Sequence, residues 1–170
     1  MLNDCKYGYD IHGTLMTLTL LRAPTFPDED ADRGHHFCTY SIYPHGGAFD
    51  ATKTYAHAYS LNNPMIAVKA MGSSDSLPLS YSPISIDKGN ILCEVVKEAE
   101  DTDEYIFRLY DCSNGRTEAN IDFGFEIEKA ELCDMCENTI KALDVKDNRI
   151  ALNFGAFEIH TVKVTAKNKI

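Results

Sequence analysis

Positive charge is scarce in this sequence of 170 residues. Lys and Arg together number 16 against 26 Asp and Glu, which gives a formal charge of −10, and the basic residues form no cluster. Nucleic acids and anionic membranes bind proteins through a basic face. We therefore expect no nucleic acid and no membrane among the partners of this chain.

A long hydrophobic run is also missing. The longest apolar stretch, Leu15 to Leu21, is interrupted by Thr17 and Thr19, and it falls well short of the ~20 apolar residues that span a bilayer. Residues Met1 to Lys6 contain neither the basic segment nor the apolar segment of a signal peptide. The sequence therefore predicts neither a membrane span nor secretion.

The cysteines do not have the distribution of a disulfide framework. They are scattered through apolar or strand-like segments, at Cys5, Cys38, Cys93, Cys112, Cys133 and Cys136. Disulfide-dense domains are typically small, secreted and too short for a sufficient core, whereas this chain is long enough for one. We interpret the cysteines as reduced, which favours a cytoplasmic location.

Alternation of apolar and polar residues dominates the chain and is typical of half-buried strands. It predicts strands over residues 14–21, 37–43, 84–86, 91–96, 105–110, 119–127, 149–154 and 157–165. Only Ala51 to Leu61 has the pattern of a helix, and Asn62, Asn63 and Pro64 end it. Many strands at this spacing, without amphipathic helices between them, predict an all-β fold built as an antiparallel sandwich.

Two polar segments interrupt the strands. Arg22 to Gly34 is an acidic loop with two prolines, too long for a hairpin turn, and long ordered loops on a β scaffold often carry function. Met71 to Ser82 is rich in serine and has the composition of a linker. We expect it to divide the chain near residue 80, into domains 1–80 and 81–170.

No motif composes a complete active site or metal site. The acidic loop lacks the glycine, glutamate and flanking helices of a calcium-binding EF-hand. His35 and His36 are adjacent on a predicted strand and so point to opposite faces. Cys133 and Cys136 form a single CxxC without a second ligand pair. We predict no catalytic residue, no metal ligand and no cofactor in this chain, with a metal site on the CxxC as a less favoured alternative.

Several blocks of the sequence, taken in chain order, resemble the C-terminal region of glycoside hydrolase family 38 α-mannosidases of the cytosolic and bacterial type. These blocks cover nearly the whole chain and are Leu2–Asp10, Leu18–Pro24, Pro27–Asp28, Ala31–Phe37, Tyr43–His45, Leu61–Pro64, Val96–Asp101, Arg108–Tyr110 and Asn153–Ile159. Each block is short, so their joint order carries the resemblance.

The resemblance implies a partial central β domain over residues 1–80 and a small immunoglobulin-like β-sandwich over residues 81–170. Family members are several times longer, and their α/β catalytic domain holds the zinc ion, the aspartate nucleophile and the general acid that hydrolyse α-mannosides with retention. No residue here matches those motifs. We therefore expect a fragment that is inactive alone, whose partners are the catalytic domain and, in the intact enzyme, the α-mannoside.

The resemblance further implies that the β region contributes to the rim of the sugar site. Amide, acid, amine and phenol groups crowd the stretch Asn3 to Asp10, and such groups suit sugar hydroxyls. The substrate-rim candidates are Asp4, Lys6, Tyr7, Arg22, Asp32 and Arg33. From the residues alone, a structural role for Asp32 and Arg33 is the alternative. A stand-alone carbohydrate-binding or protein-interaction β module is the alternative for the whole chain.

Overall fold

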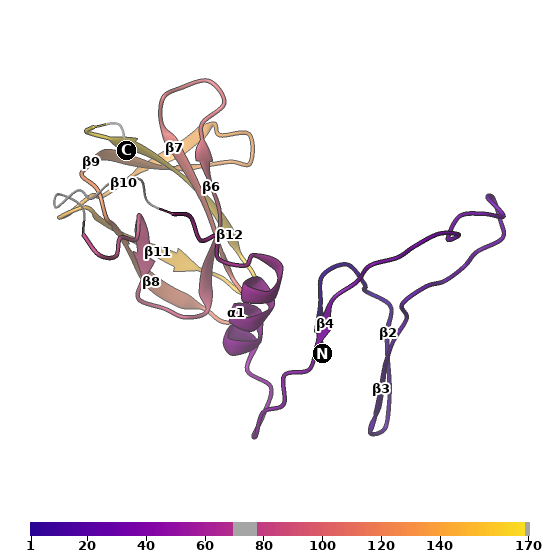
Figure 1. The fold of residues 1–170 in the computed structure, drawn as a ribbon. Coiled ribbons are helices and arrows are strands. Elements are labelled where there is room, and N and C mark those ends of the chain that lie inside the picture. The colour runs from indigo at the N-terminus through magenta and orange to yellow at the C-terminus, as the bar shows by residue number, and fades with distance from the viewer. Residues whose placement is uncertain (70–77, 169–170) are drawn as a thin grey trace. The chain divides into compact units, whose positions relative to one another are not determined.

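The computed structural model describes residues 1–69 and 78–168, and the chain divides into two units, Met1–Lys69 and Ala70–Ile170 (Figure 1). The linker predicted over Met71 to Ser82 falls mostly on residues 70–77, which lie outside the described residues. Among the residues that are described, no helix is both long and apolar enough to cross a membrane.

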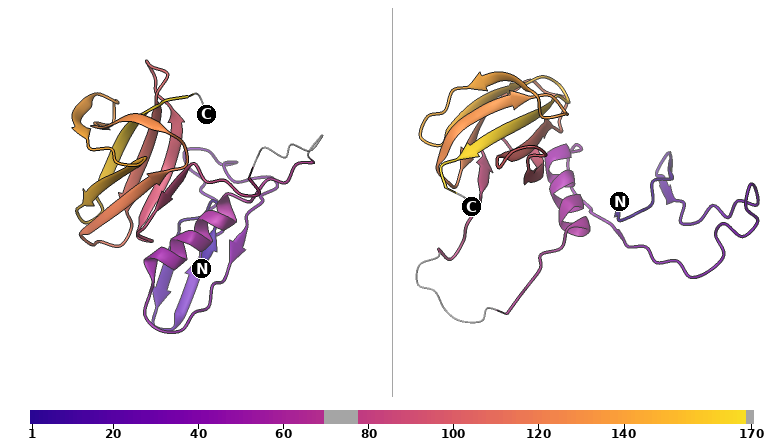
Figure 2. Two further views of the ribbon diagram at one scale, coloured as in Figure 1. Left: turned by 90° about the vertical axis from the view of Figure 1, so that its left-hand side faces the viewer. Right: turned by 90° about the horizontal axis from the view of Figure 1, so that it is seen from above.

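The second unit is an antiparallel β-sandwich, as the alternating pattern predicts. Its strands are β5 (Ile84–Ile86), β6 (Ile91–Glu98), β7 (Tyr105–Asp111), β8 (Thr117–Phe123), β9 (Ile127–Cys133), β10 (Thr139–Leu143), β11 (Arg149–Phe154) and β12 (Ile159–Ala166). One sheet has the order β10-β9-β12-β7-β6 and the other the order β11-β8-β5. Both sheets are visible from two further directions in Figure 2.

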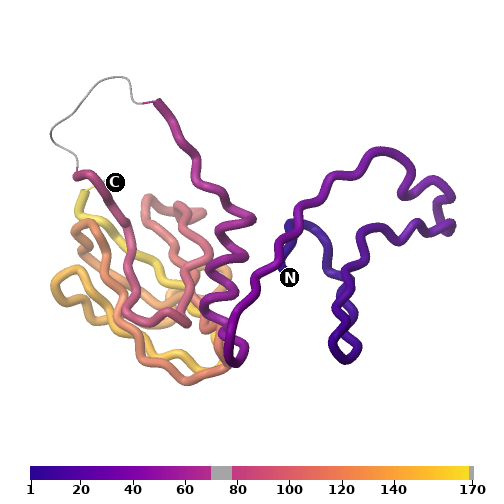
Figure 3. Tube along the Cα trace, turned by 60° about the horizontal axis from the view of Figure 1, so that its bottom comes forward, coloured from indigo at the N-terminus to yellow at the C-terminus, as the bar shows by residue number. Residues whose placement is uncertain are grey.

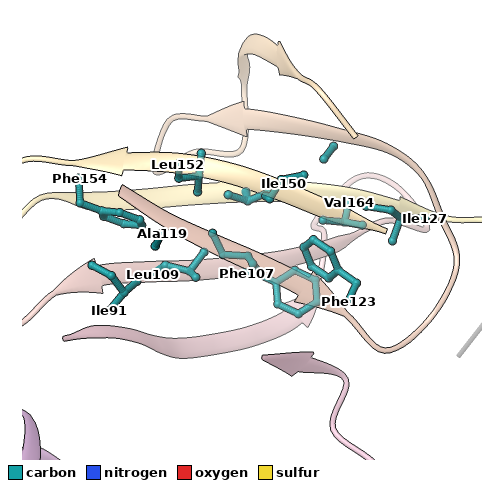
Figure 4. Close-up of a cluster of buried hydrophobic side chains, with 13 residues drawn as sticks. Ile91, Phe107, Leu109, Ala119, Phe123, Ile127, Ile150, Leu152, Phe154 and Val164 are labelled. Carbon is teal, nitrogen blue, oxygen red and sulfur yellow. The ribbon is translucent and has the colours of Figure 1, made fainter. Parts of the chain in front are cut away.

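The core of the second unit lies between the two sheets. Figure 4 shows its apolar side chains, which come from strands of both sheets. Phe107 of β7 contacts Phe123 of β8 edge to face, with ring centroids 5.2 Å apart, and Val162 and Val164 of β12 are fully buried. Alternate positions of each strand supply this core, because successive side chains of a strand point to opposite faces.

Asp111, at the end of β7, is a buried carboxylate that the sequence did not indicate. Its side chain is 0% exposed, and it accepts hydrogen bonds from Asn90 Nδ2 (2.7 Å), Ser113 Oγ (2.9 Å), Gly115 N–H (3.1 Å) and Phe157 N–H (3.1 Å). Burial raises the pKa of this carboxyl, but these donors outweigh burial and lower it to about 2. Asp111 thereby ties together three connections at one end of the sandwich.

The strand predicted over Ala119 to Ile127 is confirmed only as far as Phe123, because the chain then turns: β8 ends at Phe123 and β9 begins at Ile127. Gly124 N–H donates to Pro83 O at 3.1 Å. A Cβ on Gly124 would lie 2.2 Å from Ser82 O, so only glycine allows this approach. The sequence also did not predict β10. The first four residues of this strand are all exposed, so neither of its faces is marked by buried apolar residues.

The first unit contains two short antiparallel strand pairs and one helix. Figure 3 shows the path of the chain through this unit. Strand β1 (Leu2–Asn3) pairs with β4 (Tyr40–Ser41), and β2 (Tyr9–His12) pairs with β3 (Leu15–Leu18). Helix α1 (Ala51–Asn62) begins after Asp50, whose carboxylate accepts from Lys53 N–H at 3.1 Å. The predicted helix is confirmed, but the strand predicted over residues 37–43 is reduced to Tyr40–Ser41.

The first unit has no hydrophobic core of its own. None of residues 1–69 is buried, and large apolar side chains are left open, including Tyr7 (93% exposed), Phe37 (91%) and Phe26 (86%). Burial of apolar surface is the main force that stabilises a fold. The two units therefore differ sharply in the stability that their described residues can provide.

Hydrogen exchange should report this difference. We expect slow exchange at the amides of Ile91 to Val96 and Ile150 to Phe154, which lie in the sandwich, and faster exchange at Leu15 to Leu21. Mass spectrometry of peptides from the exchanging chain measures both. Slower exchange in the first unit than in the sandwich would contradict the assignment of the core.

Candidate functional site

A pocket of about 570 Å³ lies within the first unit. Three stretches of chain line it: residues 5–8, residues 19–22, and the two loop residues Asp32 and His36. Four of the six substrate-rim candidates are among these residues, namely Lys6, Tyr7, Arg22 and Asp32. The pocket therefore collects most of the polar side chains that the sequence singled out, although they are far apart in the chain.

The first wall of the pocket begins at a turn that Asn3 fixes. Its side-chain oxygen accepts from the N–H groups of Cys5 (3.0 Å) and Lys6, which turns the chain out of β1. Thr19 N–H then donates to Gly8 O at 2.8 Å. A Cβ on Gly8 would lie 3.1 Å from Thr19 Cβ, so a glycine favours this close approach of the two walls.

Asp32 closes the acidic loop against its own start. Its Oδ2 accepts from Ala23 N–H at 2.6 Å, and its backbone carbonyl lies 2.9 Å from His36 Nε2, which donates to it. Ala23 has a left-handed backbone, with φ +47°. The loop is thus folded back by a carboxylate that bonds to backbone rather than to Arg33. Nothing in the sequence indicates the contact with Ala23.

Arg33 and Asp4 do not line the pocket and make other contacts. Arg33 Nη1 lies 2.7 Å from Asp30 Oδ1 in an exposed ion pair, of a kind that contributes little to stability. Both oxygens of Asp4 accept from Thr39 N–H at 3.0 Å. The hydrogen bond from this backbone N–H is the main reason that the pKa of Asp4 is lowered. Asp4 therefore holds local structure in the first unit, whereas Arg33 lies in a surface ion pair.

The CxxC segment forms a tight turn after β9. Cys133 is buried and Cys136 is exposed, while Asp134 Oδ1 accepts from the N–H groups of Cys136 and Asn138, both at 2.9 Å. Within residues 1–69 and 78–168, no three His, Cys, Asp or Glu side chains are grouped so that they could hold a metal ion. The hydrogen bonds of Asp134 account for the turn.

Comparison with known proteins identifies the chain. Residues 90–162 match the family described as "Glycosyl hydrolases family 38 C-terminal beta sandwich domain", and residues 1–30 match "Glycosyl hydrolases family 38 C-terminal domain". The chain is 36% identical to human "Alpha-mannosidase 2C1" over 164 residues, which are 94% of this chain and 16% of the human protein. The chain belongs to the C-terminal region of glycoside hydrolase family 38.

Two further relatives are similar in sequence to this family 38 region. "Alpha-mannosidase G" of Dictyostelium discoideum is 38% identical over 121 residues, which are 71% of this chain and 11% of the relative. "Alpha-mannosidase" of Saccharomyces cerevisiae is 32% identical over an alignment of 186 positions, which covers 96% of this chain and 17% of the relative. The chain thus spans about a sixth of the length of most of the curated relatives that it matches.

The match to the family 38 C-terminal domain covers the first two walls of the pocket. Residues 1–30 include Lys6, Tyr7 and Arg22, together with Gly8 and Thr19. Thr19 and His36 were not among the candidates named from the sequence. Thr19 lies in the pocket because its backbone approaches Gly8 closely. His36 lies there because its ring bonds to the backbone of Asp32, which folds the loop back.

Proposed function

We propose that this chain is the non-catalytic C-terminal part of a zinc-dependent, retaining α-mannosidase of the cytoplasm. In this proposal the zinc ion, the nucleophile and the general acid belong to a catalytic domain outside the chain. The observation that carries the proposal is the absence of a core in residues 1–69, combined with a chain that spans about a sixth of its relatives. A unit of this kind needs a larger partner to cover it.

The apolar side chains of the first unit supply the surface for that partner. Phe26, Phe37, Ile42 and Phe49 are each more than two-thirds exposed. Large apolar side chains left exposed in such number are typical of surfaces that another protein covers. We assign the catalytic domain of the same enzyme to this role, because the relatives carry this region within one long chain.

The pocket of the first unit supplies the rim of the sugar site. Lys6 and Arg22 offer N–H donors, Asp32 offers an acceptor, and the exposed ring of Tyr7 offers a flat apolar face. Neutral sugars are bound by this combination of hydrogen-bonding groups and an aromatic ring. We propose Lys6, Tyr7, Arg22 and Asp32 as the groups that face the α-mannoside, with Asp4 supporting the first wall and Arg33 outside the pocket.

The isolated chain should not hydrolyse an aryl α-mannoside, with or without added zinc. It supplies rim groups and supporting structure, whereas the bond cleavage is assigned to the catalytic domain. A coloured aryl α-mannoside measures the activity, and the intact enzyme is the positive control. Zinc-dependent turnover by the chain alone, well above that of a mock preparation, would refute the proposed function.

Arg22→Lys in the full-length enzyme should lower kcat/KM about ten- to a hundredfold, which corresponds to the loss of one hydrogen bond from a charged donor. An arginine directs two parallel N–H groups at a hydroxyl pair or carboxylate, and a lysine does not. Arg33→Lys is the matched control, because Arg33 pairs with Asp30 and does not line the pocket. Equal losses of kcat/KM in both variants would contradict the assignment of Arg22, rather than Arg33, to the rim of the sugar site.

A further inference from the structure

The pocket of the first unit carries more positive than negative charge, although the whole chain has a formal charge of −10. Lys6 and Arg22 both line it. Among the lining residues, which all belong to the described range 1–69, the single acid is Asp32. The acids of the loop segment 28–30 are not among them. The pocket is therefore a local cationic site on an acidic protein.

Asp32 does not neutralise the two cations of the pocket. Its Oδ2 accepts from Ala23 N–H at 2.6 Å, which holds the loop closed. In the part of the chain that the structure describes, the side chains of Lys6 and Arg22 form neither an ion pair nor a hydrogen bond. Both positive charges are therefore available to a ligand.

Lys6 differs in this respect from the other lysines that are largely covered. Lys97 is 30% exposed and lies 2.9 Å from Glu137, and Lys163 is 14% exposed and lies 4.0 Å from Glu104. Lys6 is half-buried, yet within residues 1–69 and 78–168 it has no such partner. Covering an ammonium group without a counter-ion costs free energy. Lys6 therefore favours an anion that this chain does not supply.

A phosphate monoester suits these two cations better than a neutral hydroxyl does. It carries a charge of about −1.5 to −2 at neutral pH and has acceptor oxygens on all sides. A guanidinium such as that of Arg22 binds phosphate through parallel N–H groups, and an ammonium such as that of Lys6 binds it as a point charge. The volume of about 570 Å³ leaves room for a sugar beside the phosphate, next to the exposed ring of Tyr7.

We propose that this pocket binds the phosphate of a phosphorylated mannoside, so that the enzyme binds mannosides with a phosphate monoester more tightly than neutral ones. The inference rests on the proposed function, which places the α-mannoside against the same pocket. Lys6 and Arg22 neutralise the phosphate, and Tyr7 packs against the sugar ring. Asp32 keeps the loop folded against the pocket through its bond to Ala23.

The test is inhibition of the full-length enzyme, which hydrolyses a neutral aryl α-mannoside in the presence of mannose, mannose 6-phosphate or inorganic phosphate. At low ionic strength we expect an inhibition constant about tenfold lower for mannose 6-phosphate than for mannose, as for one hydrogen bond to a charged group. Salt screens such charges, so the ratio should approach one in about 1 M sodium chloride. Inhibition by inorganic phosphate as strong as that by mannose 6-phosphate would overturn the assignment to a phosphorylated sugar.

Three variants locate the effect. Lys6→Gln and Arg22→Gln should each lower the ratio of the two inhibition constants to about threefold or less, and this ratio does not depend on how active each variant is. Arg33→Gln is the matched control, because it removes a cation of the same unit that lies outside the pocket. A tenfold ratio that persists in both pocket variants would refute the proposal, as would an equal fall in Arg33→Gln.

A labelling measurement tests the same site without any substitution. Mannose 6-phosphate should protect Lys6 of the full-length enzyme from acetylation by acetic anhydride, as read by peptide mapping in a mass spectrometer. Lys53, an exposed lysine of the same unit, should stay reactive. A Lys6 that does not react even without mannose 6-phosphate would show that the intact enzyme covers it with its own groups, which would overturn the proposal.

Failure of this inference can be told apart from failure of the proposed function. Equal inhibition by mannose and mannose 6-phosphate, together with a loss of kcat/KM for the neutral substrate in Arg22→Lys, would refute the phosphate preference alone. The rim assignment would then stand. An Arg22→Lys enzyme with unchanged kcat/KM for the neutral substrate would instead count against the rim itself.

Discussion

Asp111→Asn should lower the free energy of unfolding of the sandwich by about 3 kcal/mol, because buried N–H donors lose their acceptor. The fully buried carboxylate accepts from Gly115 N–H and Phe157 N–H through one oxygen and from Asn90 and Ser113 through the other. An amide can accept at only one of the two positions, so either the N–H groups of Gly115 and Phe157 or the Asn90 NH₂ group and the Ser113 N–H would face its NH₂ group. Urea unfolding followed by circular dichroism measures the loss.

The exposed Asp101 provides the matched control on the same unit. Asp101→Asn should change the free energy of unfolding by less than about 0.5 kcal/mol, as is usual for a surface substitution. If Asp111→Asn were equally neutral, the hydrogen bonds around Asp111 would not contribute to stability, and the three connections at that end of the sandwich would be held by their apolar contacts alone.

The stability that Asp111 contributes should also depend on pH. Its pKa is about 2 in the folded chain against an ordinary 3.8. A folded pKa below the unfolded one stabilises the fold above pH ~4 and loses this contribution as the pH falls towards 2, in total about 2.5 kcal/mol. The Asp111→Asn variant lacks this contribution, so its stability should fall less steeply between pH 4 and pH 2 than that of the parent chain.

Phe37→Ser should destabilise the full-length enzyme by about 3–4 kcal/mol, the usual cost of truncating a buried phenylalanine, while leaving the isolated chain almost unchanged. Phe37 is 91% exposed in this structure, so the loss in the intact enzyme would come from the contact that the proposed catalytic domain makes with it. Thermal unfolding of both proteins, each with and without the substitution, gives the comparison.

Ile140→Ser on β10 is the control for this experiment. Ile140 is also a largely exposed apolar residue, but it lies on the sandwich rather than on the coreless first unit. It should have a small effect in the intact enzyme and in the isolated chain. A full-length enzyme that tolerates Phe37→Ser as well as the isolated chain does would place the covered surface of the first unit away from Phe37.

Only part of the candidate site could be predicted from single segments of the sequence. Lys6, Tyr7 and Arg22 are candidates because they lie in blocks that resemble the family; the resemblance to family 38 is confirmed, and the role of these residues stays a prediction. Asp32 was found as part of a polar cluster, but its partner was not, since Ala23 carries no side-chain signal for a hydrogen bond. Thr19 and His36 enter the pocket only through contacts between distant parts of the chain.

The sequence by itself determined the helix and several strands of the sandwich. Alternation of apolar and polar residues specified strands such as β7, β11 and β12, and Asp50 with Asn62 to Pro64 bounded the helix, because these features act within a few residues. Tertiary structure alone decided that β12 lies between β7 and β9, that Gly124 breaks a predicted strand against Ser82, and that Asp111 is buried. Each of these depends on segments that meet only after folding, so no local pattern encodes them.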